Sequence, residues 1–554
     1  MDDSCAKFEA AIDDSGNTET KACDQTSVLP DKVIHHIMSL LHPKDFINTC
    51  SLSKRWNRLW CSVPVLQFRQ SNWPHDRTLK SEEIGEAQQQ RFVNFVDRSI
   101  QKFIDMRKHH QSIQKFDLQI LRMDTESVSH IDRWLKFATQ NHVQNLYLSM
   151  PRGSDENMEF YNLPVETVFA SQSLQSVLLS GCELNLEHVK SSIHCPSLRK
   201  LALLHVYLDN NTIRNLFRCC PSITTFRLSN AWGLKKLHIS RIPSVETVEV
   251  HSNTGDLEEV YIDDAPMLRS IELWYRRDLR SIKLWERRDR TFTYNFHRCS
   301  ALTSLSFNYC FLTNKHLQDV LSGIPSLESL YIRNCMLDRT IEISGRKLKA
   351  LTLIYSDVSE VKIDNSYNGC FSFSFEGRVE AIPHLHLKSW SCHCQINLHN
   401  ACNDVINANW FLVLRQKLVF LNCKKSIRIN LHEYIKISDL KQQFKEITLP
   451  SSFEVEDLTI YTDTSSLDFT ALLDRFLQLC HPSTISIQSN HIAIRERIQS
   501  LLEKLWMDKD IESCCVSNNI KCWRHCLEYI VFESNKVKEG MEVSTFRLAW
   551  KLDN

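Results

Sequence analysis

This chain has few glycines, no formal net charge and no long apolar run. Only 11 of its 554 residues are glycine, and it shows neither a Gly-rich phosphate loop nor a strained nucleophile motif, which argues against a hydrolase or transferase centre. Lys plus Arg and Asp plus Glu both total 66, so the formal net charge is zero and does not favour nucleic acid or a membrane surface. We therefore predict a non-catalytic protein with no catalytic residues and no cofactor.

No segment contains the roughly 18 consecutive apolar residues that a membrane-spanning helix needs. The first residues, Met1 to Cys5, carry neither the basic nor the apolar part of a secretory signal. These absences predict a soluble chain in the cytoplasm, the nucleus or both. The 21 cysteines, an odd number, are then expected to be buried, reduced thiols.

Residues 28–68 have the pattern of three short helices. Pro30 and Asp31 suit a first helical turn, where a missing N–H costs little and an acid meets the positive end of the helix dipole. An apolar stripe with the spacing of one helical face follows, formed by Ile34, Ile37, Met38 and Leu41. Helices shorter than about 12 residues are marginal alone. We therefore predict that these helices pack on one another and offer a docking surface to a partner.

A Leu-x-x-Leu-x-Leu template recurs from Val143 to Leu387. Neighbouring copies that begin at Leu174, Leu198 and Ile223 are 24 or 25 residues apart, which leaves room for a helix before each next strand. Between Ile223 and Leu279 the steps shrink to 11 or 12 residues, too few for a helix. The pattern predicts a leucine-rich-repeat solenoid with parallel strands, backed by helices in some coils and by strands in others.

Residues 28–68 also resemble a known family. Leu29-Pro30, Pro43-Lys-Asp-Phe46 and Leu52-Ser-Lys-Arg-Trp56-Asn-Arg-Leu59-Trp60 are similar to the plant form of the F-box. The resemblance implies binding to a Skp-family adaptor, which joins a cullin scaffold and a RING subunit in a ubiquitin ligase. The residues that it assigns to adaptor binding are Leu29, Pro30, Ile34, Ile37, Leu40, Leu41, Pro43, Phe46, Leu52, Trp56, Leu59 and Trp60.

The C-terminal segment Lys521-Cys-Trp523-Arg-His525-Cys-Leu527 is similar to the FBD-like domain of plant F-box and leucine-rich-repeat proteins. The fold class expected is α/β, with a three-helix F-box, a solenoid and a C-terminal α/β cap. The predicted divisions are a disordered tail at 1–26, the F-box at 27–68, a linker and amphipathic helix at 69–110, the solenoid at 111–395 and the FBD-like cap at 396–554. Within 69–110, we predict the linker at 70–90 and the helix at 91–103.

Residues 268–278 and 279–289 agree at nine of eleven positions, so they resemble a tandem duplication whose copies would face opposite sides of a two-stranded coil. Basic and aromatic residues alternate here, as they do in sites for phosphate or acidic peptides. The simpler interpretation is a solvated ladder in which arginine stems cover apolar surface. We keep the hypothesis that Arg276, Arg277, Arg287 and Arg288 contribute to client binding.

The resemblance implies a substrate-recognition subunit that bridges the adaptor and an unknown client protein, without chemistry of its own. Two alternatives remain open, a non-degradative F-box scaffold and a binding protein that senses a small molecule. Zinc needs four soft ligands in a tetrahedron, and two clusters offer soft side chains. They are Cys392-His393-Cys394 and the set Cys514, Cys515, Cys522, His525 and Cys526. We predict no metal, because no Cys-x-x-Cys pair is matched by a second one.

Overall fold

The computed structural model describes most of the chain after residue 28. The described residues are 29–41, 49, 53–60, 65–72, 81–106, 112–151, 160–186, 193–253, 257–275, 293–364, 369–387, 392–399, 405–421, 423–431, 436–437, 443, 453–462, 469–489, 496, 500, 523–538 and 541–551. The chain divides into two compact units, residues 1–143 and 144–554. Within the described part of the chain, no helix has both the length and the apolar character needed to cross a membrane.

The first unit contains helices and a parallel strand pair. Its elements are α1 (Asp31–Leu40), α3 (Lys54–Trp60), β1 (Val65–Arg69), the 3-10 turn η3 (Gln70–Asn72), α4 (Ser81–Met106), β2 (Lys115–Gln119) and α5 (Thr125–Gln140). β1 and β2 pair in parallel, with Phe68 opposite Leu118. Asp124 caps α5, because its side chain accepts the Ser127 N–H at 2.7 Å. The predicted second helix, after Pro43, lies outside the described residues.

The amphipathic helix predicted within 69–110 is present as α4, but it begins earlier than expected. Residues 81–90, predicted as linker, form its first turns. Polarity alone suggested a linker there, yet Glu, Gln and Ala, which make up most of that segment, are strong helix formers. Further along the helix, Phe92, Val96 and Phe103 are buried in the core of the first unit.

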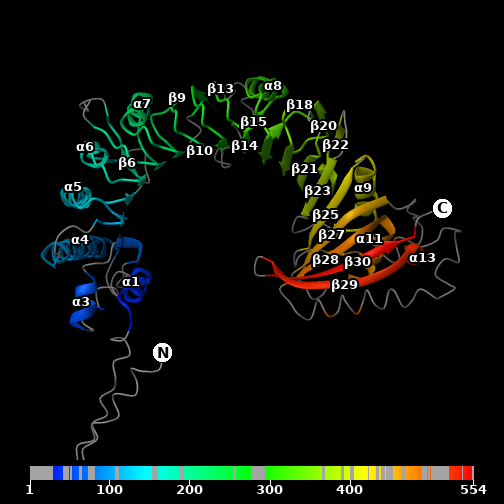
Figure 1. Ribbon diagram of the computed structural model, residues 1–554, viewed down its shortest axis with the longest axis horizontal. Helices are drawn as coiled ribbons and strands as arrows, with labels where there is room; N and C mark the ends of the chain where they lie inside the picture. The colour runs from blue at the N-terminus through cyan, green and yellow to red at the C-terminus, as the bar shows by residue number, and fades with distance from the viewer. Residues whose placement is uncertain are drawn as a thin grey trace, which may run out of the picture. The chain divides into compact units, whose positions relative to one another are not determined.

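The second unit is built on a long sheet whose strands run parallel from β3 to β28 (Figure 1). In sheet order they are β3 (Asn145–Ser149), β5 (Ser176–Ser180), β7 (Lys200–Leu204), β8 (Thr225–Ser229), β10 (Thr247–Ser252), β12 (Ser270–Tyr275), β14 (Ser304–Asn308), β16 (Ser329–Arg333), β19 (Ala350–Ile354), β21 (Phe371–Gly377), β23 (Cys392–His399), β25 (Lys424–Leu431), β27 (Phe453–Thr462) and β28 (Cys480–Ser489). The second anchors of successive template copies, such as Leu201, Phe226 and Val248, are register partners and are buried. The predicted repeat solenoid is confirmed.

The backs of the coils are mixed, as the repeat spacing predicts. The longer coils carry helices, namely α6 (Val165–Phe169), α7 (Asn210–Cys219) and α8 (Asn314–Gly323). The shorter coils instead place alternate strands in two small parallel sheets, β9 (Lys236–Ser240) with β11 (Glu259–Asp263) and β13 (Thr293–His297), and β18 (Thr340–Ser344) with β20 (Glu360–Asp364) and β22 (His384–Leu387). The remaining short elements are the pairs β4 (Tyr161–Asn162) with β6 (Cys182–Glu183), β15 (Phe311–Leu312) with β17 (Met336–Leu337) and β24 (Val405–Ile406) with β26 (Lys436–Ile437), and the turn η5 (Val379–Ala381).

The third strand of the first small sheet, β13, comes after the tandem copy at 279–289. β11 pairs with β9 on one edge and with β13 on the other. A strand has two edges, and β13 supplies the second partner because Tyr294 and Phe296 repeat the inward alternation. Residues 276–292 lie outside the described part, so the predicted opposite orientation of the two copies stays untested.

The main sheet continues past residue 395, where we predict the start of the cap. β23, β25, β27 and β28 extend the parallel register without a break, although isoleucine and valine replace most template leucines. The sheet then closes with antiparallel strands, β30 (Met541–Trp550) beside β28 and β29 (Leu527–Lys538) beside β30. The helices of this region that the structure describes are α9 (Ala408–Val419), α11 (Phe469–Leu479) and α13 (Trp523–Cys526). The domain boundaries themselves stay predictions.

The FBD-like motif ties α13 to α11. Trp523 Nε1 donates to Asp474 Oδ1 at 2.9 Å, and Arg524 Nη2 lies 3.2 Å from the same oxygen. Trp523 is buried, so this carboxylate satisfies an indole N–H that would otherwise be costly to bury. The motif therefore acts in packing.

Candidate protein-docking surfaces

One arginine ties the start of α1 to α3. Arg55 Nη2 lies 2.5 Å from Asp31 Oδ1 and donates to the Leu29 carbonyl oxygen, also at 2.5 Å. The Ser53 hydroxyl accepts the Trp56 N–H at 3.2 Å at the start of α3. The two helices are only 10 and 7 residues long, so this connection and the packing behind it hold them in place.

The predicted adaptor-binding residues divide into an inner and an outer set. Ile34 and Trp56 are 0% and 4% exposed, so they form the core beneath α1 and α3 and offer almost no surface. Pro30 is exposed, and Leu29, Ile37, Leu41 and Leu59 are half-buried. The others lie outside the described side chains: Leu40, Pro43, Phe46, Leu52 and Trp60.

Sequence reasoning missed the most exposed apolar residue among the described side chains of α1. Val33 is 41% exposed and lies beside Pro30, one position before the buried Ile34. Its place outside the Ile34–Met38 stripe is the signal that could have identified it. Pro30, Val33 and the half-buried Ile37 form the outer α1 face, to which a partner has access.

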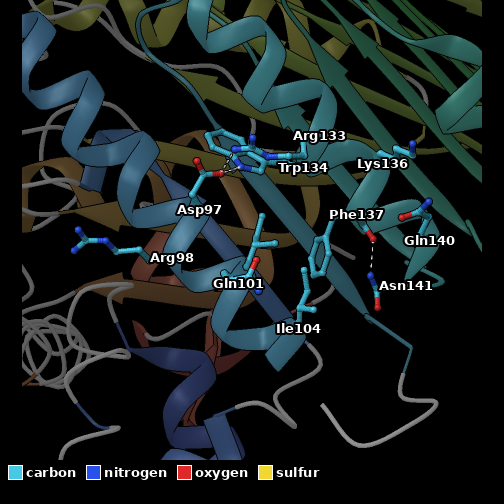
Figure 2. A pocket seen from close by; sticks show the side chains of 11 residues that line it. Asp97, Arg98, Gln101, Ile104, Arg133, Trp134, Lys136, Phe137, Gln140 and Asn141 are labelled. Carbon is cyan, nitrogen blue, oxygen red and sulfur yellow. Dashed lines mark hydrogen bonds and ion pairs between the residues drawn. The ribbon is translucent and has the colours of Figure 1, made fainter. Parts of the chain in front are cut away.

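A groove of about 760 Å³ runs between α4 and α5 in the same unit. Figure 2 shows Asp97 reaching from α4 toward Arg133 and Trp134 of α5. Asp97 Oδ1 accepts from Arg133 Nη2 at 2.6 Å and from Trp134 Nε1 at 2.7 Å, and Asp97 Oδ2 lies 3.0 Å from His130 Nδ1. Partial burial works to raise the pKa of Asp97, but the hydrogen bonds from Arg133 and Trp134 outweigh it and lower that pKa. The Asp97 carboxylate therefore holds α4 and α5 together, and we assign the groove a structural role.

The outer face of the main sheet carries aromatic side chains at the carboxyl ends of its strands. The rings of His251 and Trp274, which are register partners on β10 and β12, have centroids 5.4 Å apart. The Trp274 ring lies 5.7 Å from that of Tyr309, and further along the sheet Tyr355 lies 5.8 Å from His399. We call His251, Trp274, Tyr309, Tyr355 and His399 the carboxyl-end row.

A recurrent turn places several of these residues. Tyr309 and Tyr355 follow β14 and β19 with φ of 57° and 47°, in the left-handed region. Each donates its backbone N–H to the next coil, Tyr309 to the Arg333 carbonyl at 2.8 Å and Tyr355 to the Glu376 carbonyl at 2.7 Å. A residue with positive φ also follows β7, β8 and β16, so side chains at such turns recur along one edge of the sheet.

Charge and burial set the chemistry of the row. Burial, followed by the nearby positive charge of Arg227, lowers the pKa of His251, so this imidazole is neutral near pH 7. Trp274 Nε1 donates to the Glu272 carboxylate, and His399 Nε2 lies 3.3 Å from Glu376 Oε1. Aromatic residues are enriched in protein interfaces, so the row offers a protein partner both ring faces and polar groups.

The four arginines assigned to client binding, Arg276, Arg277, Arg287 and Arg288, lie outside the described residues. The last described residues before them, Trp274 and Tyr275, end β12. Trp274 belongs to the carboxyl-end row, so the described part of this region places an aromatic side chain there.

The two soft-ligand clusters differ in the structure. Cys514, Cys515 and Cys522 lie outside the described residues, whereas His525 and Cys526 belong to α13. In the other cluster, Cys392 and Cys394 of β23 are joined by Cys423, and the three sulfur atoms lie within 4.8 Å of one another. Cys423 is distant in sequence, so local spacing does not reveal this group.

Two protein families and several relatives match parts of this chain. The F-box domain family matches residues 27–68, and the family described as FBD-associated F-box protein At5g56370, LRR repeats, matches residues 131–286. Relatives from Arabidopsis thaliana include putative F-box protein At1g49610 (27% identity, 45% of this chain, 55% of the relative) and F-box/FBD/LRR-repeat protein At5g56420 (26%, 45% and 55%). F-box/LRR-repeat protein At3g58900 is 30% identical over 41% of this chain and 65% of its own length. The chain thus spans about half to two thirds of the length of these relatives.

Proposed function

This chain is a plant-type F-box/leucine-rich-repeat protein, and from that premise we propose that it is the substrate-recognition subunit of a Skp-cullin-F-box ubiquitin ligase. The observation that carries the proposal is the F-box match over residues 27–68, in which α1 turns Pro30 and Val33 outward. The F-box binds a Skp-type adaptor, and through it the cullin and RING subunits. An exposed apolar helix face is what such a helix-in-groove contact requires.

The second surface of the proposed bridge is the outer face of the main sheet. The carboxyl-end row offers neighbouring aromatic rings on a repeated ladder of strands, a combination suited to interface hot spots. The chain would perform no chemistry itself. It would raise the effective concentration of client lysines beside the ubiquitin-conjugating enzyme. We propose that it acts in the cytoplasm, the nucleus or both.

The test is binding of the full-length chain to a purified Skp-family adaptor, measured by titration. A Pro30→Ala, Val33→Asp variant places a charge on the outer α1 face without touching Ile34. If these positions are hot spots, the loss is about 2 kcal/mol or more, roughly a 30-fold rise in Kd. The matched control is Val419→Asp on α9, where the valine is 48% exposed, and this change should leave adaptor binding intact.

A second variant separates contact from folding. Ile34→Ala empties a fully buried position and should lower the free energy of unfolding of the first unit by about 2 to 5 kcal/mol, with adaptor binding lost as a consequence. Unimpaired adaptor binding by the Pro30→Ala, Val33→Asp chain, or no binding by the unaltered chain, would contradict the proposal. Client turnover in cells with and without the F-box then distinguishes a degradative receptor from a non-degradative scaffold.

A further inference from the structure

Three cysteine sulfur atoms meet at the amino ends of two neighbouring strands of the second unit. Cys392 and Cys394 are two residues apart on β23, so their side chains point to the same face of the sheet. Their Sγ atoms are 3.8 Å apart. Cys423, one residue before β25, places its Sγ 2.7 Å from that of Cys394. β23 and β25 pair in parallel with His393 opposite Lys424, which brings Cys423 beside Cys392.

Among the described residues, these cysteines form the one group in which three sulfur atoms lie within 4.8 Å of one another. Other buried cysteines interact in pairs, as Cys195 and Cys220 do. Cys335 and Cys480 donate to backbone carbonyls at 3.3 Å, as expected for thiols packed as small hydrophobic groups. Within the described residues, the Sγ atoms of Cys392, Cys394 and Cys423 contact one another. A disulfide would use two of these sulfurs and leave the third, whereas a soft metal ion would bind all three.

A positively charged side chain lies at the rim of the cluster. Cys392 and Cys394 are buried and Cys423 is half-buried. Lys425 is also buried, and its Nζ donates to the Cys423 carbonyl at 3.1 Å. A fixed cation therefore lies beside three sulfurs, and thiolate is the form of cysteine that binds metal.

We propose that Cys392, Cys394 and Cys423 form a zinc site. With Zn–S bonds of about 2.3 Å, the sulfurs of a tetrahedral site are about 3.8 Å apart, which matches the separation of Cys392 and Cys394. Cys423 lies at the rim of the cluster. A rotation of its side chain that moves Sγ by about 1 Å would increase the distance between the Sγ atoms of Cys423 and Cys394 to about 3.8 Å. Three thiolates and Zn²⁺ leave one negative charge, which Lys425 offsets. The fourth ligand is water or Cys370. Cys370 is exposed and immediately precedes Phe371, the register partner of Cys392 on the neighbouring strand.

The test uses the full-length chain, purified under reducing conditions in the presence of Zn²⁺ and freed of unbound metal. Elemental analysis should give about one zinc per chain, and cobalt substitution should give thiolate-to-metal charge-transfer absorption. Cys394→Ser should lower the metal content about tenfold. Cys335→Ser, a buried cysteine from another coil, is the matched control and should keep the metal.

Alkylation of the unaltered chain supplies a readout that does not depend on whether a variant folds. Tryptic cleavage places Cys423 in the peptide 418–424 and Cys335 in the peptide 334–339, without a second cysteine in either. Zinc should slow alkylation of Cys423 and leave that of Cys335 unchanged. Three results would overturn the proposal: a chain without stoichiometric zinc, a Cys394→Ser chain with undiminished zinc, or a Cys394–Cys423 disulfide that yields no metal site after reduction.

Discussion

Replacing Asp97 by alanine is expected to loosen the contact of α4 with α5 by about 2 to 3 kcal/mol. Trp134 is 1% exposed, so removing the acceptor of its Nε1 leaves a buried donor unsatisfied, at a cost of about 1 to 3 kcal/mol. The ion pair adds little, because the Arg133 side chain is 61% exposed and such pairs contribute about 1 kcal/mol or less. The buried indole therefore dominates the expected loss.

Two further variants separate these contributions. Asp97→Asn keeps an amide oxygen that accepts from Trp134 but removes the charge, so it should cost about 1 kcal/mol or less. Arg133→Ala should cost about the same, since it removes the same ion pair. The three variants thus form a graded series in which only alanine at position 97 disrupts the hydrogen bond to Trp134.

Hydrogen–deuterium exchange of the full-length chain is the assay, read on peptides from α5. A loss of 2 kcal/mol corresponds to roughly 30-fold faster exchange of amides that exchange through this local opening. Peptides from the second unit should be unchanged and act as the internal control. Equal effects of Asp97→Asn and Asp97→Ala would refute the reasoning, because the charge rather than the buried indole would then control the contact.

Two other outcomes are expected of the second unit. Because the pKa of His251 is lowered in the fold, the unfolded chain binds this proton first as the pH falls. The free energy of unfolding should therefore decrease as the pH falls below about 6.5 toward the folded pKa. His251→Asn should reduce this decrease in thermal unfolding, and an unaltered pH profile would contradict the assignment. Trp274→Ala with Tyr309→Ala should weaken client capture about 30-fold if the row contains a hot spot, as measured by quantitative mass spectrometry of co-purifying proteins at unchanged adaptor binding. Met267→Ala, an exposed residue before β12, is the control, and equal losses from both changes would exclude the row.

The repeat architecture could be predicted because its signal is local and repeated. Each copy of the template places its anchors within six residues, and the burial of Leu201 or Phe226 follows from that spacing alone. The shortened steps after Ile223 also predicted the change from helical to strand backs. The position of β13 could not be predicted, since pairing with β11 depends on which distant segment fills a sheet edge.

The candidate sites were less visible in the sequence, for two physical reasons. The apolar pattern of α1 identifies helix-forming residues, but only packing shows that Ile34 is buried while Val33 is exposed. Contacts across coils connect residues far apart in the chain: 29 residues separate Cys394 from Cys423. Register between strands, which no single segment encodes, brings such pairs together.

The order in which the closing strands are synthesised has a consequence for the nascent protein. β30 is made after β29, yet it lies between β28 and β29 and pairs with both. When a ribosome has reached residue 540, β28 still has an open edge and β29 has no neighbour to join. An unpaired edge is a template for aggregation, so a chain interrupted just before residue 541 would lack β30 and leave edges of both of its neighbours exposed. Synthesis of β30 is therefore the step that protects this end of the sheet from aggregation.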